Sequence, residues 1–171
     1  MTANLRFPLV ARSLAAFGVS VFLVATAASA GGGPIQVARV IPYQDESRIP
    51  EKIVAECDEL GEKLGRFVNE YATKYDVTMT QVDEVDPTSK GRVLVVEITD
   101  ALSAGNAFIG HRKSMSAHAE LFDGGVSKGS IDFTRDSGGG FAGGYKSSCS
   151  VLGRCTKALG KDIAGWLRDH Q

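Results

Sequence analysis

Hydrophobic residues recur at helical spacing in two long stretches of the chain. In the first stretch, roughly residues 50–74 with its flank, they advance in steps of three or four at Ile53, Cys57, Leu60, Leu64, Val68, Tyr71 and Tyr75. In the second, which runs to about Asp169, the same steps connect Leu152, Cys155, Leu159, Ile163 and Trp166. This spacing collects the apolar side chains on one side of a helix, so both stretches are predicted to be amphipathic helices.

Between and before these helices, apolar residues fall at strand spacing. The predicted strands cover residues 35–41, 77–82, 92–99, 114–122 and 126–134. The third is apolar on both faces, which is typical of a central strand, whereas the fourth alternates apolar with polar residues and is expected to have one face in solvent. Asp123-Gly124-Gly125 predicts a tight hairpin between the last two strands, because glycine readily adopts positive φ. Residues 83–91 and 103–110 are predicted to be loops.

The predicted order is strand, helix, four strands, helix. Because each helix is apolar on one side only and the sheet has a wet face, the economical arrangement lays both helices across one side of the sheet. The expectation is a single two-layer α+β domain over residues 31–171, with a five-stranded, mainly antiparallel sheet. Gly61, Gly65, Gly153 and Gly160 interrupt the helices at about 1 kcal/mol each relative to alanine. Their presence indicates close approach to a neighbouring element or a groove for a partner.

Residues 1–30 have the pattern of a secretory signal peptide. Two arginines precede an apolar run at 14–26, and Ala28-Ser29-Ala30 supplies the small side chains that signal peptidase requires. The predicted mature chain therefore begins at Gly31. The apolar run is shorter than the roughly 20 residues that span a bilayer. We expect a periplasmic protein with no stable membrane anchor after signal cleavage.

Composition and charge narrow the class of function. The chain has 171 residues, 43% hydrophobic and 23% charged, with 19 basic and 20 acidic side chains. Loss of the signal removes two arginines and leaves a net charge of −3. Such a domain has no cationic field of the kind that attracts nucleic acid or anionic lipid, so a nucleic-acid partner is not expected.

The three cysteines predict a disulfide, because an exported protein meets an oxidising compartment. Cys149 and Cys155 are six residues apart, about 9 Å along a helix axis, so they can pair only if the helix begins after Cys149. A bridge from Cys57 to Cys149, or to Cys155 in place of Cys149, would close a loop of roughly 90 residues or more and stabilise the fold by about 4–5 kcal/mol. The inter-helix bridge is the favoured hypothesis and the local bridge the alternative. No cysteine precedes Cys57, so no lipidated cysteine is expected at the mature N-terminus.

A glycine-rich segment before the last helix approaches a phosphate-binding motif without matching it. Residues 139–147 lie between a strand and a helix and contain Lys146. A P-loop needs its lysine directly after the last glycine, and here Tyr145 intervenes between Gly144 and Lys146. We interpret residues 137–144 as a mobile loop that is dispensable for folding.

No catalytic, cofactor-binding or metal site is recognised in the sequence. His111 and His118 are seven residues apart, which places them on opposite faces of a continuous strand, and neither has a thiol or carboxylate at ligand spacing. His170 is expected to fray near the helix C-terminus, where a cation is favoured. The Gly-x-Ser-x-Gly pattern is absent. No cofactor is expected.

Two segments carry a resemblance to known proteins. Residues 149–167 and 55–60, reading CSVLGRCTKALGKDIAGWL and AECDEL, resemble small exported proteobacterial proteins of unknown function. More distantly, the layout is similar to the N-terminal domain of the periplasmic protein of the Tol system. The resemblance implies a Gram-negative periplasmic address and an α/β fold, and it implies no reaction. The chain lacks the propeller and lipid anchor of the Tol comparison, so that role does not follow.

The leading hypothesis is a non-catalytic periplasmic protein that binds a protein or a cell-envelope component. It rests on a complete predicted core, a signal peptide and no recognisable catalytic set. The alternatives are a hydrolase whose site is assembled from distant residues, and a small-ligand or metal carrier that uses the glycine loop or His118.

Overall fold

The computed structural model describes residues 33–106, 110–137 and 147–170. Its elements, in chain order, are β1 (Ile35–Ala38), η1 (Glu46–Arg48), α1 (Glu51–Glu56), α2 (Leu60–Lys74), β2 (Met79–Val82), β3 (Arg92–Asn106), β4 (Gly110–Asp123), β5 (Val126–Ser137) and α3 (Ser148–Arg168). The predicted signal peptide lies outside the described residues, and so does most of the 137–144 segment.

One five-stranded sheet organises the fold, in the order β2-β1-β3-β4-β5. β3, β4 and β5 form a long antiparallel meander, whereas the short β1 pairs in parallel with both β2 and β3. The helical connection between β1 and β2 supplies the crossover that this parallel pair needs. The predicted α+β class is confirmed, and the sheet that was expected to be mainly antiparallel is mixed, with β1 in parallel pairing on both sides.

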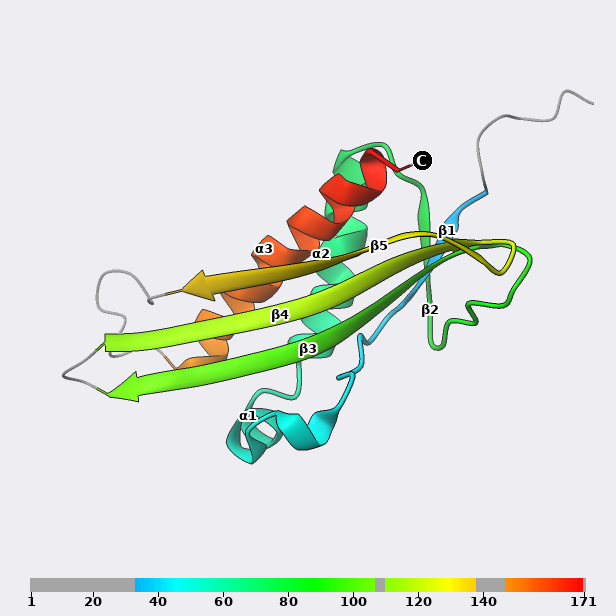
Figure 1. Cartoon of the computed structure of the whole chain (residues 1–171). Coiled ribbons are helices and arrows are strands. Elements are labelled where there is room, and N and C mark those ends of the chain that lie inside the picture. Colours follow the sequence, from blue (N-terminus) through cyan, green and yellow to red (C-terminus); the bar gives the residue numbers. More distant parts are fainter. Residues whose placement is uncertain (1–32, 107–109, 138–146, 171) are drawn as a thin grey trace, which may run out of the picture.

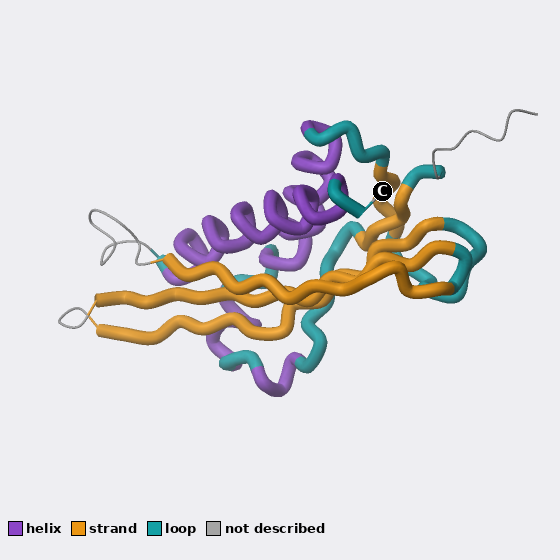
Figure 2. The backbone as a smooth tube through the Cα atoms, turned by 45° about the horizontal axis from the view of Figure 1, so that its top comes forward, coloured by secondary structure: helices purple, strands orange, loops and turns teal. Residues whose placement is uncertain are grey.

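α2 and α3 lie side by side on one face of the sheet (Figures 1 and 2). The core fills the space between them, with Leu64 and Val68 from α2, Leu159 and Ile163 from α3, and Leu94 from β3 all fully buried. Placing both helices on one face is therefore correct. Within the described residues, no helix combines the length and the apolar character that a membrane span requires.

The first predicted helix is interrupted. Instead of one helix over residues 50–74, the chain forms α1, turns at Cys57, and starts α2 at Leu60. The turn is closed by the Leu60 amide, which donates to the Cys57 carbonyl at 3.2 Å. The apolar residues keep helical spacing across the break because both helices bury one face in the same core, so periodicity alone did not reveal it.

Strand lengths also differ from the sequence-based expectation. β3 continues to Asn106 and β4 begins at Gly110, so the predicted loop at 103–110 is wrong at residues 103–106 and 110, and its centre at 107–109 lies outside the described residues. β5 extends to Ser137, three residues beyond its expected end. Backbone hydrogen bonds to the neighbouring strand satisfy the peptide groups of these polar extensions. Alternation of apolar and polar side chains does not reveal such pairing. The predicted hairpin is confirmed, with Gly124 and Gly125 at φ of 58° and 81°.

Three of the helix glycines mark close contacts, as predicted. An added Cβ at Gly61 or Gly65 would lie 2.3 or 2.4 Å from a backbone oxygen of residue 41 or 39, so α2 rests directly on the chain that follows β1. At Gly160 a Cβ would lie 2.6 Å from Phe67 Cβ, where α3 meets α2. Gly153 differs, because nothing lies within 4 Å of its Cβ position.

Candidate functional site

Between β1 and α2 the chain makes an excursion to the far part of the sheet, here called the α1 shelf (residues 43–59). It begins along the free edge of β3, where the backbone N–H of Gln44 donates to the Ile98 carbonyl at 2.9 Å. Its apolar anchors are Ile49, Ile53 and Cys57, which are each at most 4% exposed. Figure 1 shows α1 beside β3, and Ile53 of α1 belongs to the same buried cluster as the core residues of α2 and α3. The shelf is thus a surface layer attached at a few points.

A disulfide between Cys57 and Cys149 attaches the end of the shelf to the first turn of α3. The Cα atoms are 5.2 Å apart, and the sequence separation is 92 residues. This is one of the two inter-helix pairings expected from the sequence. α3 begins at Ser148, so Cys149 and Cys155 belong to the same helix and lie too far apart to pair.

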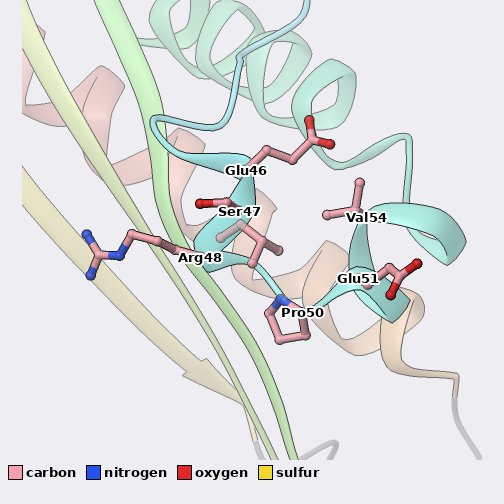
Figure 3. Close-up of a pocket in the computed structure, with 7 residues that line it drawn as sticks. Glu46, Ser47, Arg48, Pro50, Glu51 and Val54 are labelled. Atoms are coloured by element: carbon pink, nitrogen blue, oxygen red, sulfur yellow. The ribbon is translucent and has the colours of Figure 1, made fainter.

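Three cavities open around the shelf in the described part of the chain. The widest, about 630 Å³, is lined by residues 46–51 and Val54. Figure 3 shows Pro50 and Val54 beside this hollow, with the Arg48 guanidinium and the Glu51 carboxylate pointing to opposite sides. A second, of about 210 Å³, lies over the disulfide. A third, of about 190 Å³, lies between α1, β3 and α3 and is called the inner cavity below.

The outer surface of the shelf is acidic. Residues 43–59 carry six acidic side chains and two basic ones, a net charge of −4, and all eight are exposed. Lys52 lies 3.9 Å from Glu56, so one of the two cations is already engaged. Burial raises the pKa of the Tyr43 phenol, and the nearby Glu46 raises that pKa further. A partner that matches this surface would be basic.

The inner cavity has a polar floor supplied by two serines. It is lined by Pro50, Lys52, Ile53, Glu56 and Cys57 from the shelf, Ser103 from β3 and Ser148 from α3. The two hydroxyl oxygens are 3.0 Å apart. Behind them, the Lys113 Nζ donates to Ser103 Oγ, and the Lys113 side chain is 5% exposed. The floor of the cavity therefore includes the Ser103 hydroxyl, which is hydrogen-bonded to the buried ammonium of Lys113.

Sequence reasoning missed Lys113, Ser103 and Ser148. The signal was available, because Lys113 is two residues before Met115 and thus shares the core-facing side of β4. It was overlooked because the predicted strand started at residue 114. A serine that receives a hydrogen bond from an ammonium is a polarised donor, whereas a nucleophile would have to donate its proton to a free amine. The arrangement supports binding of an acceptor.

The remaining thiol is Cys155, which is 2% exposed. Burial raises the pKa of this thiol, and the carboxylate of Asp136 raises it further. Both effects disfavour the thiolate, which is the reactive form of cysteine. Cys155 is therefore placed as a core residue and not as a nucleophile.

The histidines do not assemble a metal site among the described side chains. His118 lies on the outer face of the sheet, where its Nδ1 is 2.9 Å from Asp132 Oδ1 on β5. No group of three metal-ligating side chains occurs in the described residues, and the side chain of His111 lies outside them. His170 is held at the end of α3, with its Nδ1 2.8 Å from the Trp166 carbonyl oxygen and its ring tilted by 34° against the Trp166 ring, at a centroid distance of 4.8 Å.

A separate groove of about 400 Å³ lies at β1 and the 83–87 loop. Its walls include Val40, Val85 and Val95, and Glu84 and Glu97 also line it. The side-chain amide of Gln44 donates to the Glu97 carboxylate there at 3.2 Å. No buried charge or hydroxyl pair converges on this groove among its lining residues. The glycines of the P-loop-like segment lie outside the described residues.

A comparison with solved structures supports the fold. No protein-family model and no curated protein matches the sequence. Protein XCC0632 from Xanthomonas campestris, described as DUF330, shares the fold: its TM-score is 0.53 at 11% identity, over 80% of this chain and 84% of that chain. The PelC dodecamer from Paraburkholderia phytofirmans gives a TM-score of 0.48 at 12% identity, over 76% of this chain and 87% of that one. A minor lipoprotein from Acinetobacter baumannii gives 0.46 at 12% identity, over 79% and 92%.

Proposed function

We propose that this protein is exported and acts without catalysis, by binding a basic protein partner on the α1 shelf. The observation that carries the proposal is the Cys57–Cys149 disulfide, which fixes to α3 the segment around which the cavities open. A covalent clamp on a surface layer preserves the shape of that layer, and preorganisation of this kind strengthens binding.

Export is supported by two independent features. The Ala28-Ser29-Ala30 pattern follows an apolar run, as in a signal peptide cleaved before Gly31. Stable disulfides form in the periplasm and are rare in the cytosol. The periplasm is therefore the compartment that we propose for the folded protein.

The partner's charge follows from the shelf. A net charge of −4 on residues 43–59 repels acidic surfaces and accelerates encounter with basic ones. The ammonium of Lys52 offsets part of the negative charge of Glu56, whereas Glu46 and Glu51 border the widest cavity. These two carboxylates are the groups that we expect to contact the partner.

Site-specific photo-crosslinking in living cells tests this proposal. A photoreactive residue at Val54, which is partly buried beside the widest cavity, should give a discrete protein adduct. The matched probe at Lys161, which is exposed on α3, should give none. Charge reversal at Glu46 and Glu51 to lysine should reduce the adduct at least fivefold. An adduct at Lys161 alone, or an equal yield after charge reversal, would contradict the proposal.

A further inference from the structure

Lys113 lies on the core-facing side of β4, directly before a run of buried apolar side chains. The next four residues on this side of the strand are Met115, Ala117, Ala119 and Leu121, which are at most 1% exposed. Lys113 is the one charged side chain that is buried among the described residues. Burial of an ammonium is unfavourable unless hydrogen bonds or an opposite charge compensate it. Within the described part of the chain, the Ser103 hydroxyl is the one hydrogen-bond partner of the Lys113 ammonium, and it compensates only part of this cost.

The hydroxyl protons of Ser103 and Ser148 determine which ligand groups can bind at the floor of the inner cavity. Ser103 Oγ accepts from Lys113 Nζ, and it is also hydrogen-bonded to Ser148 Oγ. The two serines together own two hydroxyl protons, and their mutual bond uses one of them, whichever serine donates. Among the described residues, no group accepts the other proton. Since both hydroxyls line the cavity, an acceptor placed there would receive it.

The walls define what surrounds that acceptor. Pro50, Ile53 and Cys57 contribute apolar surface beside the serines. A volume of about 190 Å³ has room for a polar head and a short aliphatic group, since one water takes about 30 Å³. One buried positive charge behind the floor matches a ligand with one negative charge.

We propose that the inner cavity binds a carboxylate carried on a small aliphatic group, held by the Ser103 and Ser148 hydroxyls with Lys113 behind them. The proposal rests on the proposed function, in which the shelf is the binding surface, and names the chemistry of its innermost contact. A doubly charged phosphate fits less well, because Glu56 lies at the rim and Lys52 is paired with it at 3.9 Å. The carboxylate comes from either a peptide C-terminus or a short fatty acid.

Amide chemical-shift titration of the full exported protein, with its disulfide intact, tests this. Butyrate should shift the amides of Ile53, Ser103 and Ser148 in a saturable way. Butyramide, which has nearly the same shape without the charge, should bind at least tenfold more weakly. A tripeptide ending in valine, with a free or an amidated C-terminus, separates the two sources. If the tripeptide with the free C-terminus binds more tightly than butyrate, the ligand is a peptide terminus. If butyrate binds more tightly, the ligand is a small acid.

Variants assign the effect to the floor. Lys113→Met should weaken butyrate at least tenfold, and Ser148→Ala about fivefold, whereas Ser150→Ala, the exposed control in the same helix turn, should change nothing. If Lys113→Met does not fold, Ser103→Ala and Ser148→Ala decide the matter. Equal binding of butyrate and butyramide, tighter binding of inorganic phosphate, or wild-type affinity in both serine variants would overturn the proposal. These titrations use no protein partner, so their failure is distinct from failure of the crosslinking test.

Discussion

Removing the disulfide by replacing both Cys57 and Cys149 with alanine should lower the free energy of unfolding by about 4–5 kcal/mol. The bridge spans 92 residues, and its loss returns the entropy of that loop to the unfolded chain. Urea denaturation measures the change. Each single variant should lose about as much as the double variant, because either substitution removes the same bond.

The loss should be concentrated in the shelf. α1 has six residues and no side-chain cap at Pro50, and a helix so short is marginal without tertiary support. Hydrogen exchange should therefore accelerate more at residues 51–56 than in α2. Loss of less than 1 kcal/mol in the double variant, with unchanged exchange in α1, would show that packing of Ile49 and Ile53 alone holds the shelf.

Gly160→Ala and Gly153→Ala should have opposite effects although both lie in α3. At Gly160 the new Cβ would meet Phe67 Cβ at 2.6 Å and the Phe67 carbonyl carbon at 2.9 Å. The obstacle is helix backbone, which cannot move without separating α2 from α3. We expect a loss of about 2–3 kcal/mol in stability, even after the gain in helix propensity.

At Gly153 the new Cβ meets nothing within 4 Å. Alanine there should raise stability by up to about 1 kcal/mol through helix propensity alone. Thermal denaturation of the two variants beside the wild type measures both effects. A neutral Gly160→Ala would mean that the two helices are farther apart than described.

The sequence predicted those parts of the fold that follow from side-chain periodicity. Alternation at Met115, Ala117, Ala119 and Leu121 located β4, and the glycines at 124 and 125 located the hairpin. The break at Cys57 was not foreseen, since Ile53, Cys57 and Leu60 keep helical spacing while the chain turns between them. Periodicity shows which side of a helix is buried. Two helices that pack against the same core both bury that side, so the spacing does not reveal the break between them.

The candidate site was harder to foresee than the fold. Ser103 and Lys113 fell in a predicted loop and its flank, because the strand ends are polar and their pairing is made by backbone alone. Ser148 joins them only through the placement of α3, 45 residues away in sequence from Ser103. A constellation made by three elements leaves no local spacing to detect. The disulfide was accessible to reasoning because cysteine has few alternative fates in an oxidising compartment.

The most direct test of the account is a non-reducing peptide map of the protein isolated from the periplasm. Export and the clamp on the shelf together predict an N-terminus at Gly31, a linked peptide pair that contains Cys57 and Cys149, and Cys155 alkylated only after unfolding. Protein that retains residues 1–30 and has Cys57 and Cys149 as free thiols would contradict the claim that the α1 shelf is the disulfide-clamped surface of an exported binding protein.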